Sequence, residues 1–408
     1  MAGFNNINST PYVALHPGQS GQEDAFGRLR MSEPFTLFDS KQLHDNGPLF
    51  WDQSITDGSG NATSTHSTAN ASVTLHVEAG DTIIRQTKTH WNYQPGKSQL
   101  CVFTANLEDI GGGTISVVVR KGSSDTAIAQ ANWNGDKLDG TGNSGKTLDP
   151  TKAQIMFIDY EWLGVGKVRF GFFVDGLPIV CHSVNNFNQL TSVYMATPTL
   201  PVRYEASVAG TTGTARVGSF TATDGLFFQW QGTTTSFDLQ HICCAVISEG
   251  GLEDRGINTY VSNGATPVDA NVAGTIYACV GVRLNSTHLD MMARPIAASM
   301  LATTEDDFEW ILLVNPTVAG TFTYASITNS GLQVATGATA NTVTGGYAIA
   351  GGHVAAGTKA GGAFGAEIAS EIWLGSKIDG TPDTFVLCVR PHGADADIRG
   401  SMVVKELR

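Results

Sequence analysis

Short runs of apolar residues, separated by turn-forming residues, continue along most of the chain. In residues 72–77 (SVTLHV) apolar and polar side chains alternate, which predicts a strand with one buried face. Residues 115–119 and 155–160 are short apolar runs, and residues 168–180 predict a hairpin that turns at Asp175-Gly176. Many short strands, with a turn every ~8–12 residues, are typical of a β-sandwich.

The second half of the chain repeats this pattern after a break at residues 248–251. A tract rich in Gly, Ala and Thr over residues 335–366 predicts long loops or an irregular hairpin, and only residues 296–303 favour a short helix. The expected fold is mainly β, with two β-sandwich (jelly-roll-like) domains. Further strands are expected at residues 275–284, 309–314, 322–327, 346–350, 371–374, 384–390 and 400–406.

Residues 1–54 are predicted to form an extended N-terminal arm, because prolines interrupt any regular pattern there. The first sandwich, concanavalin- or jelly-roll-like, is expected over residues 55–250 and the second over residues 251–408. The arm carries many large apolar side chains, so it should dock on its own domain or on a neighbouring subunit. The expected anchors are Phe26, Arg28, Leu29, Arg30, Phe35 and Phe38.

Composition supports a β-rich protein and excludes several functions. The 408 residues include 47 Gly, only 15% are charged, and the net charge is −13. Both halves are acidic, so we expect no nucleic-acid binding. No apolar run approaches the ~18 residues of a membrane-spanning helix, and no secretory leader pattern opens the chain. The six cysteines show no metal-ligand spacing and are interpreted as buried free thiols.

Residues 140–147 (GTGNSGKT) match the phosphate-binding P-loop pattern letter for letter. A working P-loop needs a buried strand before it and a helix after it, because the helix N-terminus binds the phosphates. Pro150 follows closely and the next strand begins near Ile155, which leaves no room for that helix. We therefore interpret the segment as a polar turn that uses its glycines for positive φ, and we expect no cofactor.

Asp159 and Glu161 lie on one face of a predicted strand. The segment resembles the E-x-D-x-E strand of a glycoside hydrolase family with a concanavalin-like jelly roll, but Phe157 stands at the nucleophile position. Because a retaining mechanism needs two carboxylates about 5–5.5 Å apart, we expect no enzyme here. Two polar residues that face solvent or bond a neighbouring loop are the simpler interpretation.

The remaining candidate chemistry is sparse. The ten histidines show no metal-binding spacing and no G-x-S-x-G elbow is present, so we expect neither metal nor catalytic residues. Trp91 and Tyr93, beside the turn at Pro95-Gly96, form a possible sugar-stacking surface, although a Trp and a Tyr in a sandwich core would give the same pattern.

Several phrases resemble a family of predicted virion structural proteins of tailed double-stranded DNA phages. They run in order from residue 24 to residue 251, whereas residues 105–131 are shorter or rearranged, which leaves their strand order open. The matching phrases are DAFGRLR (24–30), FDSK (38–41), PLFW (48–51), YQPGKS (93–98), DKLDGTG (136–142), EWLGVG (161–166), RYE (203–205) and VISEGG (246–251).

The resemblance implies a non-enzymatic component of a phage particle, assembled in the bacterial cytoplasm. A surface-exposed fibre, spike, baseplate-type or capsid-bound subunit is expected, attached through the N-terminal arm to other virion proteins. By analogy the subunit is a homo-oligomer, with a trimer as the expected form. The alternatives are a host-glycan-binding adhesin, the major capsid protein and a polysaccharide-degrading enzyme.

Overall fold

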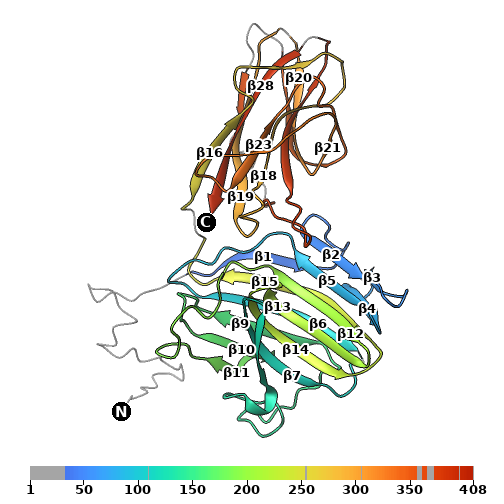
Figure 1. The fold of residues 1–408 in the computed structure, drawn as a ribbon, viewed down its shortest axis with the longest axis vertical. Helices are drawn as coiled ribbons and strands as arrows, with labels where there is room; N and C mark the ends of the chain where they lie inside the picture. The colour runs from blue at the N-terminus through green and yellow to red at the C-terminus, as the bar shows by residue number, and fades with distance from the viewer. Residues whose placement is uncertain are drawn as a thin grey trace, which may run out of the picture.

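In a computed structural model the chain is almost entirely β and forms two antiparallel β-sandwiches (Figure 1). The structure describes residues 33–108, 110–252, 255–304, 306–355, 361–364, 372–394 and 396–407. Among these residues no helix has the length and apolar character needed to cross a membrane.

The first sandwich packs an eight-stranded sheet against a seven-stranded sheet. The eight-stranded sheet contains β11 (Leu177–Val184), β10 (Val168–Val174), β9 (Gln154–Tyr160), β6 (Gln99–Glu108), β15 (Ser236–Ser248), β4 (Ser72–Glu78) and β3 (Thr63–Ser67), with β1 (Phe35–Lys41) paired to β15. The seven-stranded sheet contains β2 (Trp51–Thr56), β5 (Thr82–Thr87), β12 (Val202–Ala209), β13 (Thr212–Phe220), β14 (Gly225–Thr233), β7 (Thr114–Lys121) and β8 (Ser124–Ala129).

The long strand β15 lies in the interior of the eight-stranded sheet. One side of β15 pairs with β6, and the other side pairs first with β4 and then with β1. Alternating side chains of β15 point inward, as the pattern of buried positions along the strand shows. Strand β1 contains a β-bulge between Thr36 and Phe38, which bends the strand locally.

The second sandwich is smaller and packs a five-stranded sheet against a six-stranded sheet. The first contains β16 (Ile257–Ser262), β28 (Ala396–Leu407), β19 (Met292–Ala302), β26 (Gly361–Phe364) and β17 (Val268–Ala270). The other contains β22 (Ala325–Ser326), β23 (Leu332–Thr336), β18 (Tyr277–Leu284), β27 (Thr384–Pro391), β20 (Phe308–Val314) and β25 (Tyr347–Val354), and a separate pair is formed by β21 (Thr317–Val318) and β24 (Val343–Thr344).

The predicted arm at residues 1–54 is corrected by the structure, because its last part belongs to the first sandwich. Strands β1 and β2 are paired members of the two sheets, and the Phe38 and Trp51 side chains are buried in the core. Prolines at 34 and 48 lie outside these strands, so they interrupt the pattern without preventing the strands. Residues 1–32 lie outside the described residues.

The second sandwich brings further corrections. The helix expected at residues 296–303 lies in strand β19, because tertiary pairing with β28 outweighs local helix propensity. Within the tract at residues 335–366, the strand expected at residues 346–350 is present as the longer strand β25, which pairs with β20. Of the strand expected at residues 322–327 only Ala325–Ser326 pairs, and at residues 371–374 a single bridge joins Leu374 to Ala293.

The segment that imitates a P-loop is a polar turn, as predicted. Gly140 and Gly145 both have positive φ, and Asp139 and Thr147 form a β-bridge across the turn. The Asp136 side chain accepts a hydrogen bond from the Ser144 backbone N–H at 2.7 Å.

All six cysteines are free thiols, and five of them are buried. The interpretation of the cysteines as buried free thiols is therefore confirmed for these five, whereas Cys243 is a free thiol that is half-buried.

Candidate functional site

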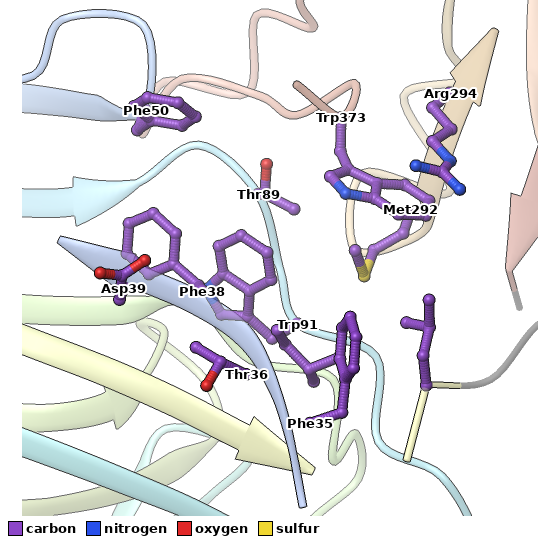
Figure 2. A pocket seen from close by; sticks show the side chains of 12 residues that line it. Phe35, Thr36, Phe38, Asp39, Phe50, Thr89, Trp91, Met292, Arg294 and Trp373 are labelled. Atoms are coloured by element: carbon purple, nitrogen blue, oxygen red, sulfur yellow. The ribbon is translucent and has the colours of Figure 1, made fainter. Parts of the chain in front are cut away.

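A cavity of about 420 Å³ lies where the two sandwiches meet (Figure 2). The first sandwich contributes side chains from β1, from the turn before β2 and from the segment after β5. The second contributes β19 and the segment at residue 373, and Leu252 comes from the link between them. The lining residues are Phe35, Thr36, Leu37, Phe38, Asp39, Phe50, Thr89, Trp91, Leu252, Met292, Arg294 and Trp373.

One wall of the cavity is aromatic and is fixed by stacking. The Phe38 ring lies 4.6 Å from the Trp91 ring at an interplanar angle of 18°, and its centroid is 6.1 Å from that of Phe50. Phe38 and Trp91 are buried, whereas Phe35 and Phe50 remain exposed at the entrance. Stacked aromatic rings are rigid, so this wall is preformed.

The opposite wall carries a cation held over an indole ring. The Arg294 guanidinium carbon lies 4.8 Å from the centroid of the Trp373 ring, which is a cation–π contact. Figure 2 shows Met292, Arg294 and Trp373 across the cavity from Phe35, Phe38 and Trp91. The cavity therefore combines aromatic faces from both sandwiches with one positive charge.

Two buried nitrogen atoms of lining residues have no hydrogen-bond partner within the described part of the chain. They are Nε1 of Trp91 and Nε of Arg294. An unsatisfied buried donor costs about 1–3 kcal/mol, and both of these donors belong to residues that line the cavity. His90, next to Trp91, is also buried, and burial lowers its pKa to about 4, which keeps the imidazole neutral at pH 7.

Direct bonds between the sandwiches fix the two walls relative to each other. The Ser376 backbone N–H donates to the Lys88 carbonyl oxygen at 2.9 Å, and the Ile378 N–H donates to Oδ2 of Asp52 at 2.8 Å. The Asn92 N–H lies 3.2 Å from the Met292 sulfur. Met292 and Leu407 of the second sandwich belong to the hydrophobic core cluster of the first. The junction is thus packed and hydrogen-bonded.

A second, smaller pocket of about 260 Å³ gathers charged residues on the first sandwich. Ser98, Asp159, Glu161, Lys167 and Arg169 line it. Asp159 forms an ion pair with Arg169, and Glu161 accepts a hydrogen bond from the Lys167 backbone N–H at 3.2 Å. The carboxylates of Asp159 and Glu161 therefore both bind groups of the β9–β10 hairpin itself. Among the described residues no group of three or more His, Cys, Asp or Glu side chains could hold a metal ion.

The structure brings some of the predicted site residues together and separates others. Phe35, Phe38 and Trp91 line the large cavity. Tyr93 instead lies in the core of the first sandwich, where its ring stacks on Tyr160 and its hydroxyl donates to the Lys97 carbonyl oxygen. The predicted anchors Phe26, Arg28, Leu29 and Arg30 lie outside the described residues.

Sequence reasoning missed the half of the cavity that the second sandwich supplies. Trp373 and Arg294 come from segments that no spacing in the sequence connects with Trp91. Trp373 beside the Gly- and Ala-rich tract was the one available signal, because Trp is enriched at interfaces.

No family model matches the chain, and no curated protein matches it. Solved structures with some likeness include the exoplasmic/lumenal domain of VIP36 in its Ca²⁺/Man3GlcNAc-bound form, with 11% identity and a TM-score of 0.27, which covers 54% of this chain and 92% of that one. The CBM2 module of the evolved Dit of Lactobacillus casei BL23 phage J-1 has 7% identity and a TM-score of 0.20, over 55% and 100% of the two chains.

A legume lectin-like domain from Entamoeba histolytica has 12% identity and a TM-score of 0.19, over 52% of this chain and 97% of that one. Values this low assign neither a family nor a ligand to the present chain.

Proposed function

We propose that the protein is a non-enzymatic adhesin that binds glycans of a host surface in the cavity between its sandwiches. The observation that carries this proposal is the aromatic cavity with two unsatisfied buried donors, Trp91 Nε1 and Arg294 Nε. A sugar ring presents an apolar face of C–H groups that packs on an aromatic ring, and its hydroxyls accept and donate hydrogen bonds. Its chemistry is therefore complementary to both features.

The accessible aromatic rings are the stacking surfaces in this proposal. Phe35 and Phe50 are exposed at the entrance and Trp373 faces them from the second sandwich. Arg294, Asp39 and Thr89 place a cation, a carboxylate and a hydroxyl on the lining. The volume lies within the ~300–1,000 Å³ of small-ligand pockets, which suits a short oligosaccharide or the end of a longer one.

A glycan array probed with the full chain, followed by titration of the best ligand, tests this function. Trp373→Ala and Phe35→Ala each should weaken binding at least about tenfold, since each removes a stacking surface. Tyr347→Ala is the matched control, because Tyr347 is an exposed aromatic residue of the second sandwich outside the cavity. An array without binding, or unchanged affinity in Trp373→Ala, would contradict the proposal.

We further propose that this adhesin is a subunit of a phage particle, as the sequence resemblance implies. The packed junction between the sandwiches supports such a role, because it presents the cavity on a fixed unit. We expect a homo-oligomer, with a trimer as the working form, attached to other virion proteins. The absence of enzymatic activity is part of the proposal and is supported by the Asp159–Arg169 ion pair and by Phe157 at the nucleophile position.

Quantitative mass spectrometry of purified particles tests the particle assignment. A few to tens of copies per particle would agree with a fibre, spike or baseplate-type subunit, and hundreds would favour the major capsid protein. Absence from particles would overturn the assignment. A truncation that probes attachment should remove residues 1–32 only, because a longer deletion would also remove strand β1 from the first sandwich.

A further inference from the structure

Three side chains with complementary chemistry meet where the two sandwiches join. Lys88 follows β5 of the first sandwich, whereas Asn315 follows β20 and Asp383 precedes β27 in the second. Nζ of Lys88 lies 3.9 Å from Oδ1 of Asp383, and the Asn315 side-chain amide donates a hydrogen bond to the same oxygen at 2.6 Å. A lysine amine and an asparagine amide therefore meet at one carboxylate oxygen.

Backbone hydrogen bonds bring Lys88 to Asp383. The Lys88 carbonyl oxygen accepts the Ser376 N–H at 2.9 Å, and the Gly375 carbonyl oxygen accepts the Asp383 N–H at 2.8 Å. A Cβ atom at Gly375 would collide with the Lys88 backbone, so glycine permits this close approach. The backbone of both sandwiches thus fixes the place where the two side chains meet.

The Asn315 side-chain amide is held in one orientation by both of its polar atoms. Its Oδ1 accepts the Thr384 backbone N–H at 2.7 Å, and its Nδ2 donates to Asp383. A donor aimed at a carbonyl oxygen stabilises the negative charge that develops there when a nucleophile attacks the carbon. The amide therefore has its oxygen on a proton donor and its nitrogen on a proton acceptor.

The amine and the carboxylate are both largely removed from water, with side chains 11% exposed for Lys88 and 7% exposed for Asp383. Burial, reinforced by the nearby Asp52 charge, raises the pKa of the Asp383 carboxyl, although the Lys88 ammonium and the Asn315 amide oppose this shift. Because burial disfavours two separate charges, a proton can pass from Lys88 to Asp383. The transfer leaves Lys88 as a neutral amine, which is a nucleophile.

From this geometry we infer that Lys88 and Asn315 form an isopeptide bond, an amide between two side chains, with Asp383 as the proton carrier. The neutral Lys88 amine attacks Cγ of Asn315, and an Nζ–Cγ bond forms. Asp383 gives its proton to Nδ2 and takes one from Nζ, the Cγ–Nδ2 bond breaks, and ammonia leaves. The ammonia takes up the proton that remains on Asp383, so atoms and charge balance without an oxidant or a further reactant.

The bond ties the end of β5 to the end of β20 and makes the junction between the sandwiches covalent. A crosslink between residues far apart in the sequence restricts the unfolded chain and so stabilises the folded protein. An ion pair would account for Lys88 and Asp383, but not for the placement of the Asn315 amide on the same oxygen. The inference is independent of the proposed glycan binding, because none of the three residues lines the cavity.

Intact-mass spectrometry of the full chain, denatured after purification, tests the bond. The chain should be lighter than its sequence by one ammonia, and tandem mass spectrometry of a digest should show a branched peptide that joins Lys88 to Asn315. The variants Lys88→Arg, Asn315→Ala and Asp383→Ala should each restore the full sequence mass. Lys377→Arg is the matched control, because Lys377 is an exposed lysine beside the same carboxylate, and it should keep the loss of ammonia.

Two results would overturn the inference. A parent chain that has the full sequence mass, both fresh and after long incubation at pH 7, would leave Lys88 and Asp383 as a simple ion pair. A loss of ammonia that persists in Lys88→Arg would come from cyclisation at an asparagine and not from a crosslink. The mass of the parent chain decides the matter even where a variant fails to fold, and circular dichroism identifies such a variant.

Discussion

The two sandwiches are built from different core residues. Most of the largest fully buried side chains belong to the first sandwich, whereas the core of the second is dominated by Val, Leu, Ala and Met around Trp310 and Tyr277. The large buried side chains of the first sandwich are Arg85, Phe103, Tyr160, Phe170, Phe172, Tyr204, Phe220, Phe227, Phe228 and Trp230.

The first sandwich also buries charged groups within hydrogen-bond networks. Arg85 donates to Nδ1 of His241 at 3.1 Å, to Oε1 of Gln42 at 3.1 Å and to the Asn46 carbonyl oxygen. Burial lowers the pKa of Arg85 to about 10 and the pKa of His241 well below its usual value. Directed hydrogen bonds to a buried cation therefore help to specify the first sandwich, in addition to its aromatic packing.

In the second sandwich the comparable buried charge is Glu406. Its Oε2 accepts the Gly331 N–H at 2.9 Å and its Oε1 accepts the Ser330 hydroxyl at 2.7 Å. These bonds tie the β22–β23 turn to β28. The Thr259 hydroxyl of β16 also donates to Oε1 of Glu406, so this network centres on an anion and joins both sheets of its sandwich, whereas the network in the first sandwich centres on the Arg85 cation.

The variant Arg85→Ala tests whether the hydrogen-bond network around Arg85 stabilises the first sandwich. Removal of the guanidinium leaves acceptors on Gln42, Asn46 and His241 buried without a donor, so the free energy of unfolding should fall by ~3–5 kcal/mol. Urea denaturation followed by tryptophan fluorescence measures the loss. Arg399→Ala, at an exposed arginine of β28, should cost less than ~0.5 kcal/mol. A loss below ~1 kcal/mol for Arg85→Ala would refute a specifying role for this network.

Two buried leucines, one in each sandwich, test whether apolar packing stabilises the two cores to the same extent. Leu239 and Leu387 are both fully buried, one in each core. Leu239→Ala and Leu387→Ala should each lower the free energy of unfolding by about 3 kcal/mol, since each leaves a cavity of similar size. Denaturant midpoints of the two variants provide the measurement. A difference above ~2 kcal/mol between them would show that the cores pack with different quality.

Acid sensitivity should arise at the junction on the side of the first sandwich. The pKa of His90 is about 4 in the folded protein against 6.5 in the unfolded chain, so the unfolded chain binds more protons between these values. The contribution of neutral His90 to the free energy of unfolding is therefore fully present above about pH 6.5 and is lost as the pH falls toward about 4. Between pH 7 and pH 5 the loss should be about 2 kcal/mol.

The variant His90→Gln isolates this contribution, because glutamine does not titrate. Thermal or urea midpoints of parent and variant, compared at pH 7 and pH 5, should show a smaller drop in the variant. Equal drops would place the acid sensitivity elsewhere, for example at the buried His241.

Particular elements show how far the sequence could be interpreted. The alternation at residues 72–77 and the Asp175-Gly176 turn predicted β4 and the β10–β11 hairpin, because both signals are local. The same reasoning missed β1 and β2, whose residues are flanked by prolines and are held by distant partners in β15 and β5. It also favoured a helix within β19, where pairing with β28 decides the structure.

The sequence by itself determined the class of fold, the turn at residues 140–147 and the free state of the cysteines, because each depends on local pattern or composition. Only the tertiary structure decided where a site could form. Trp91 and Tyr93 are two residues apart, yet Trp91 lines the cavity while Tyr93 lies in the core. Trp373 and Arg294 reach the same cavity from another domain, because packing between sheets depends on three-dimensional shape that no local spacing encodes.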